Sequence, residues 1–315
     1  MARPIWLDGI DTFPVVTVPD DAADLSEQLG TKFKFWFQDA DGNDVLFKKA
    51  RINTGEHWSE KIACELCSLL GVPHAHYDLA VWRGEKGVVS PKFVGSDERL
   101  VHANELLFRI ASGYDATNKF NNSYHTVKFV IRFLSSPASA IRPTLSCPTD
   151  RALTSAADVF VGYLLLDAWV GNTDRHHENW GIIISLRHGV RLAPSYDHAS
   201  CLGRIESDEM KRDVLTTSDR GRTLDSYATR ARSALYREAS DKKPLNPVDA
   251  FAEAARYRPA AAKYWVERLI GAQDNVDLVL ELVPDSEMSG ISKKFSRRLL
   301  LANRDRILNA MKELL

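Results

Sequence analysis

Hydrophobic and polar residues alternate along the first ninety residues in a way that is typical of β-strands. Residues 32–50, KFKFWFQDADGNDVLFKKA, form two such runs around 41–43, an Asp-Gly-Asn sequence that suits a tight turn. A second strand pair is expected within 76–94. Between the pairs, 57–73 has the apolar spacing of a helix that ends at Gly71. The pattern therefore predicts a β-rich region that contains one helix.

The pattern becomes mostly helical after about residue 100. An apolar run, FVGYLLLDAWV, ends a helix for which Thr154 or Ser155 is the candidate N-cap. A short strand pair is expected within 179–197, and the helical period returns from about residue 224. We therefore predict an α+β fold of two lobes, a small β-rich lobe over 1–95 and a larger helical lobe over 96–315.

Composition narrows the class of protein. The chain has 315 residues, 44% of them hydrophobic, which is enough to bury a sizeable core. Its 41 Lys and Arg against 42 Asp and Glu lack the basic excess that binding to nucleic acid needs. Four cysteines suit a reducing compartment, and neither a signal peptide nor a membrane-spanning run is evident. We therefore expect a cytoplasmic protein without a nucleic-acid or membrane partner.

The densest polar segment, GNTDRHHENWG, follows the apolar helix directly. Asp174 and Asn179 are five residues apart, as in the kinase loop H-R-D-x-x-x-x-N. In that loop the Asp accepts the proton of the attacking hydroxyl and the Asn binds magnesium. Asp197 follows the next strand pair, at the place of a second metal-binding Asp, with His-Ala where kinases have Phe-Gly. Carboxylate and amide oxygens are ligands that suit Mg²⁺.

The β-rich region contributes a lysine and an acid. Residues 45–48, VLFK, have the form of the kinase strand V-A-I-K, whose Lys reaches the nucleotide phosphates. Alternation on the strand points Lys49 the other way, so Lys48 is the candidate. Glu60 falls on a third face of the predicted helix, between its core face and a stripe expected to face solvent. That stripe consists of Lys61, Glu65 and Ser68. We expect Glu60 to pair with Lys48.

Together these motifs resemble the HipA-like kinases, a bacterial branch related to protein and phosphoinositide kinases. The resemblance covers nearly the whole chain and rests on LFK (46–48), GEHWSEKIACELCSLLGVPHAHYDLA (55–80), GVVSPKFV (87–94), LVHANELL (100–107), GNTDRHHENWG (171–181), LAPSYDHASCLG (192–203) and TTSDRG (216–221). It implies a bilobal, protein-kinase-like fold with ATP in the cleft between the lobes. It also implies ATP- and Mg²⁺-dependent phosphoryl transfer to a serine or threonine of a protein substrate.

The resemblance implies a role for each motif residue. Asp174 would be the catalytic acid/base and Lys48 a phosphate contact, while His176 would be either a hydrogen-bonding strut or a catalytic group. The magnesium ligands would be Asn179 and Asp197. The nucleotide would also contact Gly30 and Thr31 of a loop over the phosphates, and Ser90, Lys92 and Phe93 of a hinge beside adenine. That loop, LGTKFKF, has one glycine where many kinases have G-x-G-x-x-G.

Several alternatives stay open at this point. The acceptor could instead be a lipid or small molecule, or the chain could be a catalytically inactive nucleotide-binding regulator. In the family, phosphorylation of the glycine-containing loop switches the kinase off. The autophosphorylation sites to compare are therefore Ser26 or Thr31, which flank Gly30, and residues 216–218, Thr-Thr-Ser. Toxin members of the family work with an antitoxin, so an antitoxin-like regulator is a further expected partner.

Two minor hypotheses concern metal and redox chemistry. His74, His76, His176 and His177 could suggest zinc, but the chain lacks an HExxH motif and paired cysteine ligands beside them. Cys64 and Cys67 have CxxC spacing inside a predicted helix, which favours packing over redox chemistry.

Overall fold

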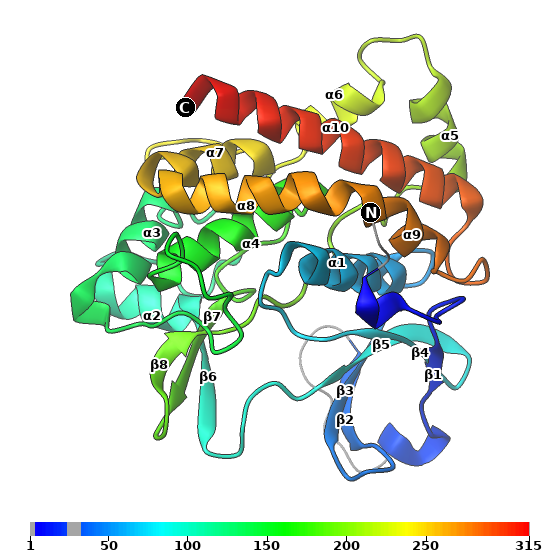
Figure 1. Cartoon of the computed structure of the whole chain (residues 1–315), viewed down its shortest axis with the longest axis horizontal. Helices are drawn as coiled ribbons and strands as arrows, with labels where there is room; N and C mark the ends of the chain where they lie inside the picture. Colours follow the sequence, from blue (N-terminus) through cyan, green and yellow to red (C-terminus); the bar gives the residue numbers. More distant parts are fainter. Residues whose placement is uncertain (1–3, 24–32, 315) are drawn as a thin grey trace.

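The fold combines a five-stranded sheet, a three-stranded sheet and a set of helices (Figure 1). The computed structural model describes residues 4–23 and 33–314. The strands are β1 (Val15–Thr17), β2 (Lys34–Gln38), β3 (Asp44–Lys49), β4 (Asp78–Trp82), β5 (Glu85–Pro91), β6 (Glu98–His102), β7 (Gly181–Ser185) and β8 (Gly189–Leu192). The helices are α1 (Glu56–Leu70), α2 (Ala103–Ile110), α3 (Val127–Ser135), α4 (Ala156–Val170), α5 (Asp208–Thr216), α6 (Leu224–Arg230), α7 (Pro247–Tyr257), α8 (Pro259–Ala272), α9 (Val276–Glu281) and α10 (Gly290–Leu314). The predicted α+β class is confirmed.

The first sheet has the order β1-β4-β5-β3-β2, with β1 parallel to β4 and the other neighbours antiparallel. The predicted turn joins β2 to β3, and its Gly42 has a φ of +80°, which glycine adopts without strain. Phe35 and Phe47 pack with their ring centroids 5.3 Å apart on the buried face. Because side chains alternate along a strand, burying Phe47 turns Lys48 to the opposite face.

Helix α1 lies between this sheet and helices α8 and α9 (Figure 1). It ends at Gly71, whose φ of +74° is left-handed, as predicted. The expected solvent stripe is wrong, because Lys61 and Glu65 are buried and Ser68 is half-buried. The Lys61 ammonium lies 4.6 Å from the centre of the Phe13 ring. The N-terminal segment therefore covers a face that the helix alone would expose.

Helix α4 is the central helix of the larger core, and every one of its residues is buried. Ser155 caps it: its hydroxyl accepts from the Asp158 N–H, and the Asp158 carboxylate accepts from the Ser155 N–H. The helix contacts α3, α7, α8 and α10 and ends at Gly171, with a φ of +70°. The chain that follows leads into β7, so the polar loop 171–180 starts from a fixed point.

The second sheet has the order β6-β7-β8 and is antiparallel throughout. The first sheet ends at Pro91 and this one begins at Glu98, on either side of the boundary predicted near residue 95, although the division into lobes stays a prediction. Among the described residues, no helix combines the length and apolarity needed to cross a bilayer.

Candidate active site

Strand β3 places Lys48 between two carboxylates. Its Nζ lies 2.9 Å from Asp197 Oδ1 and 3.3 Å from Glu60 Oε2. Burial alone would lower the pKa of Lys48, but Asp197 and Glu60 raise it well above its ordinary value. The ammonium is therefore charged over the whole physiological range. Lys49, on the other face of the strand, pairs instead with Glu85 at 3.1 Å.

Glu60 is the fully buried acid of this group. Its Oε1 accepts a hydrogen bond of 2.6 Å from the backbone N–H of His198, the residue after Asp197. Burial would raise the pKa of Glu60, but Lys48 and His198 hold it below its ordinary value. Helix α1 is thus tied through one carboxylate both to β3 and to the segment that carries Asp197.

Asp197 is held by its backbone as well as by Lys48. Its φ of +58° lies in the left-handed region, which non-glycine residues adopt uncommonly and Asp more readily than most. Its N–H donates to the Tyr77 hydroxyl at 3.2 Å. Just before it, Ser195 forms a parallel bridge with His74, beyond the end of α1. These contacts fix the direction of the carboxylate at the cost of some backbone strain.

A buried ion pair organises the loop that contains Asp174. The Arg175 guanidinium donates to both carboxylate oxygens of Asp167 in α4, at 2.7 and 2.8 Å, and to the Asn179 carbonyl at 2.8 Å. Asn172 donates to Asp167 and accepts from the N–H of Asp174. Such a bidentate pair is geometrically strict. It therefore fixes the loop at both ends of the Asp174–Asn179 spacing.

Asn179 and His176 complete the loop. The Asn179 amide nitrogen donates to the Asp174 carbonyl at 2.7 Å, which leaves its amide oxygen as the atom that can coordinate a cation. The Nδ1 of His176 accepts from the Glu178 N–H at 3.1 Å, and its Nε2 lies 3.6 Å from Asp174 Oδ1. Burial lowers the pKa of His176, so the imidazole is neutral near pH 7.

These groups border one cleft of about 570 Å³. The residues that line it are Lys34, Trp36, Leu46, Lys48, Arg51, Tyr77, Ser90, Pro91, Phe93, Leu100, His102, Lys119, Phe120, Asp174, His176, Glu178, Asn179, Tyr196 and Asp197. They come from both sheets, from the segments that carry Asp174 and Asp197, and from the chain between α2 and α3, which contributes Lys119 and Phe120. The cleft thus has four cationic and three carboxylate side chains around its walls.

The structure brings most of the candidate residues to this cleft. Lys92 does not line it: its side chain pairs with Asp44 at 2.9 Å and its N–H donates to the Asp44 carbonyl. Gly30 and Thr31, with Ser26, lie outside the described residues. Glu60 lies behind Lys48 and is not itself in the lining. The hinge candidates Ser90 and Phe93 do line the cleft.

Two residues of the site, Arg175 and Tyr196, were not predicted from the sequence. Arg175 was inside the quoted motif without a role, although an acid in an otherwise apolar helix, Asp167, was a signal that a buried cation would pair with it. Tyr196 was missed as well; its ring stacks on Phe93 with centroids 5.8 Å apart, and its hydroxyl contacts His102 at 2.8 Å. Nothing in the local sequence brings 93, 102 and 196 together.

The histidine and cysteine hypotheses can be placed as well. Among the residues that the structure describes, no three His, Cys, Asp or Glu side chains gather so as to hold a metal ion. Cys64 and Cys67 are free and buried, and burial raises the pKa of Cys64 to about 12. A thiol with that pKa is protonated at neutral pH, so packing is the role that Cys64 has here.

No protein-family model and no curated protein matches this sequence. Solved structures do match its fold. A proinflammatory kinase of Helicobacter pylori, CtkA, superposes with a TM-score of 0.70 at 18% identity, over 93% of this chain and 94% of that one. HipA of Shewanella oneidensis, solved with HipB and operator DNA, gives 0.50 at 14% identity, over 99% and 69%. The chain therefore has a kinase fold, similar to those of CtkA and HipA.

Proposed function

We propose that this chain is a phosphotransferase that transfers the γ-phosphoryl group of ATP, with Mg²⁺, to a serine or threonine hydroxyl of a protein. One observation carries the proposal: Lys48 lies between Glu60 and Asp197 at a cleft that Asp174 and Asn179 also line. In kinase folds, such a lysine–glutamate pair, together with a metal-binding Asp, is the arrangement required for transfer. An inactive scaffold would gain nothing from keeping all five groups together.

The residues divide the reaction between them. Lys48, charged and aimed into the cleft, donates to phosphate oxygens. Asp174 accepts the proton of the acceptor hydroxyl as the new O–P bond forms and the bond to ADP breaks. His176 acts as a strut, because its acceptor Nδ1 places the ring proton on Nε2, on the side of Asp174. Arg175 holds the loop through Asp167.

The donor set fits Mg²⁺. Asp197 offers a carboxylate and Asn179 an amide oxygen at the same cleft, and Mg²⁺ takes one or two such protein ligands beside water and phosphate oxygens. When bound, the ion would neutralise charge on the transferring phosphoryl group. Asn179 has a second duty, since its amide nitrogen holds the Asp174 carbonyl. Asn179→Ala should therefore cost about 1 kcal/mol of stability in addition to the metal ligand.

The test is incubation of purified protein and of a cell lysate with γ-labelled ATP, in Mg²⁺ and in EDTA. We expect labelled serine or threonine in protein when Mg²⁺ is present and no label in EDTA. The variant Asp174→Asn should give no label, although it should still bind ATP. Label confined to a lipid or small-molecule fraction would replace the acceptor class. ATP binding without any transfer by the wild type would make the chain a nucleotide-binding regulator.

The same incubation maps self-phosphorylation. The hydroxyl of Thr216 is exposed at the end of α5 and bonds only locally, to the Arg212 carbonyl at 2.8 Å, so this candidate is accessible. The competing residues Ser26 and Thr31 lie outside the described residues. We favour the glycine-containing loop, with Thr31 ahead of Ser26, because added phosphate there would compete with ATP. Phosphate found only on 216–218 would reverse that preference.

HipA was solved with HipB and operator DNA, which suggests a partner of the same kind. We propose an antitoxin-like regulator for this chain as well. Purification of the tagged full chain from its source would show whether a regulator is bound to it. The variant Asp174→Asn is purified in parallel, so that the experiment does not depend on cells that tolerate the active chain. Recovery of the chain alone at equal yield in both forms would contradict this partner.

A further inference from the structure

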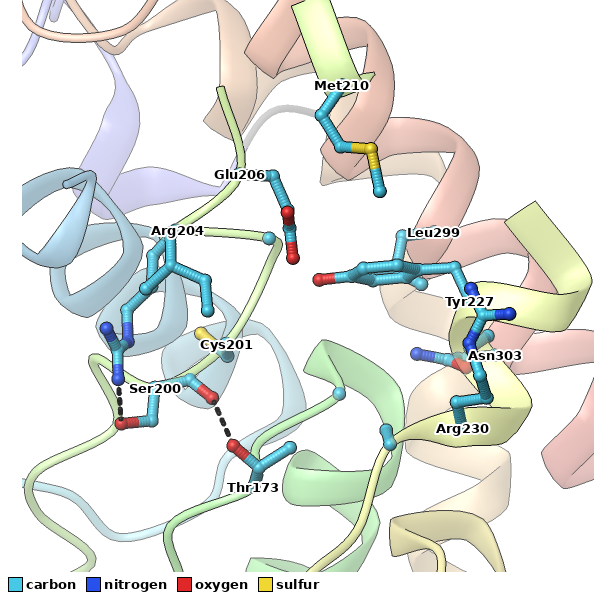
Figure 2. A pocket seen from close by; sticks show the side chains of 15 residues that line it. Thr173, Ser200, Cys201, Arg204, Glu206, Met210, Tyr227, Arg230, Leu299 and Asn303 are labelled. Carbon is cyan, nitrogen blue, oxygen red and sulfur yellow. Dashed lines mark hydrogen bonds between the residues drawn. The ribbon is translucent and has the colours of Figure 1, made fainter. Parts of the chain in front are cut away.

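A second pocket, of about 350 Å³, has Thr173, the residue before Asp174, and Ser200 in its wall (Figure 2). It is formed by the start of the polar loop 171–180, by residues of the segment 200–206, by α5 and α10, and by α6 with the residue that follows it. Asp174 itself lines the first cleft, whereas Thr173 beside it and Ser200 line the second pocket. The Ser200 hydroxyl donates to Asp174 Oδ2 at 3.1 Å. A hydroxyl can therefore approach the proposed base from this pocket.

The polar side chains around the pocket already have partners. Arg204 donates to the Ser200 hydroxyl at 2.9 Å and lies 3.4 Å from Glu56 at the start of α1. Arg230 donates to the Gly221 carbonyl at 2.7 Å. The carboxylate of Glu206 lies beside the Tyr227 hydroxyl (Figure 2). Burial raises the pKa of Tyr227, and the negative charge of Glu206 raises it further. A ligand in the pocket therefore does not have to supply hydrogen bonds to these groups.

The Asn303 amide at the end of the pocket is engaged as well. Its nitrogen donates to the Trp169 carbonyl at 3.1 Å, and its oxygen accepts from Arg306 at 3.1 Å. What remains facing the space is mostly apolar: Cys201, Ile205, Met210, the Tyr227 ring, Ala228, Ala231 and Leu299. Ile205 is 62% exposed and Met210 40%, both at the pocket. Exposed apolar side chains around a hollow favour an apolar occupant that removes them from water.

We propose that this pocket binds a large apolar side chain, such as leucine, methionine or phenylalanine, of the protein segment that presents the acceptor hydroxyl to Asp174. The inference rests on the proposed function and names its substrate class: a serine or threonine with a bulky apolar neighbour. The acceptor hydroxyl takes the place of Ser200 at Asp174 Oδ2, and the neighbouring side chain fills the space between α6 and α10. The volume suits one side chain better than a folded surface.

Methionine methyl NMR gives a direct readout, because the chain has four methionines, Met1, Met210, Met288 and Met311. Met210 lines the pocket, while Met288 and Met311 are buried elsewhere and serve as internal controls. The probes are blocked hexapeptides with a central serine and either leucine or alanine beside it, and the polyol mannitol. We expect the leucine peptides to shift the Met210 methyl, with an affinity about tenfold above the alanine peptides.

Two variants and a matched control sharpen the test. Ala231→Phe fills the pocket and Ile205→Ser removes an apolar contact at an exposed position, so both should weaken the leucine-peptide response. Ala302→Phe makes the same change on α10 beside a different hollow and should leave it intact. A shift with mannitol alone, or no shift with any probe, would overturn the proposal.

The same samples separate this inference from the proposed function. Mg²⁺-ATP is titrated against each variant by thermal shift, with phosphoryl transfer to the leucine peptide measured in parallel. Peptide binding without ATP binding would defeat the proposed function, while the binding of an apolar side chain in this pocket would stand. ATP binding and protein phosphorylation at equal rates in wild type and Ala231→Phe would defeat the pocket assignment alone.

Discussion

Two lysines near helix α1 each lie between two carboxylates, and their surroundings differ. In the cleft cluster, Lys48 contacts Glu60 at 3.3 Å and Asp197 at 2.9 Å. In the packing cluster, Lys61 contacts Glu65 at 2.7 Å and Asp78 at 2.8 Å. The two groups have the same charges, and Glu60 and Lys61 are adjacent on the helix. Composition alone therefore does not distinguish a site from a structural ion pair.

Access to a ligand distinguishes them. Lys48 and Asp197 line the cleft, and the Asp197 side chain is 30% exposed. Lys61 instead packs on the Phe13 ring, and within the described residues the packing cluster contributes nothing to the cleft lining. The cleft cluster also joins β3, α1 and the Asp197 segment, which are far apart in sequence. Charge that a ligand can reach serves chemistry, whereas charge closed off by packing serves the fold.

The two aspartates give the largest expected contrast. Asp197→Asn should reduce phosphoryl transfer by about 10²–10³-fold or more, because it removes a charge that faces the transferring group. Its stability should change little, since Asn tolerates the left-handed backbone at this position and Lys48 keeps Glu60. Asp78→Asn should leave transfer unchanged and cost about 1–2 kcal/mol of unfolding free energy. Initial rates and urea unfolding of both variants decide the matter; near-normal transfer by Asp197→Asn in saturating Mg²⁺ contradicts the site.

The lysines should separate next. Both Lys48→Met and Lys61→Met leave buried carboxylates without their cation, so both should lose about 3 kcal/mol of stability. Lys48→Met alone should lose turnover per folded molecule, by about a hundredfold. The double mutant that combines Lys48→Met with Glu60→Gln should have a turnover little lower than that of the poorer single mutant, because the two groups act through one contact. Additive losses in that cycle, or equal losses of turnover from the two lysines, would break the comparison.

Local pattern singled out the residues of the cleft cluster one by one, although their contacts join segments that are far apart in the sequence. Strand alternation placed Lys48 and Lys49 on opposite faces, and the spacing of Asp174, Asn179 and Asp197 marked the polar loops. The helical ends at Ser155 and Gly71 also follow from residues at those positions. These features depend on neighbours within a few residues, which a sequence shows directly.

The packing cluster was not predictable in the same way. A helical projection places Lys61 on a polar stripe, and only the fold brings Phe13 and Asp78 over it. The second pocket is a stronger case, since its walls come from segments between 171 and 303. Long-range packing decides both, and no period along the chain encodes it.

Acid should weaken the packing cluster in a defined range. Burial alone would raise the pKa of Asp78, but His76 and Lys61 hold it well below its ordinary value. A depressed carboxyl pKa contributes stability that is complete above the unfolded value, about 3.9, and is lost as the pH falls toward the folded value. The contribution of the Asp78 carboxylate to the gap in unfolding free energy between wild type and Asp78→Asn should be complete at pH 5. The gap should narrow below about pH 4, by at most about 1.4 kcal/mol per pH unit.

Urea unfolding at pH 7, 5, 3.5 and 2.5 measures that gap, with Lys92→Met as a control because Lys92 pairs with the exposed Asp44. A gap that stays constant to pH 2.5 would show that the Asp78 carboxylate contributes no ionic stability.

Lys49 provides the smallest effect and the closest control. It follows Lys48 on β3 and pairs with Glu85 at 3.1 Å, with side-chain exposures of 26% and 46%. Such partly exposed pairs contribute about 0–1 kcal/mol, because water screens the charges and ordering two long side chains costs entropy. Lys49→Met should therefore change the unfolding free energy by less than about 1 kcal/mol and leave both ATP binding and transfer intact. Lys48→Met, the same substitution one residue earlier on the strand, should instead lose about a hundredfold in turnover. If Lys49→Met lost activity as Lys48→Met does, the strand would present the wrong lysine to the cleft, and the cleft cluster would have to be reassigned around Lys49.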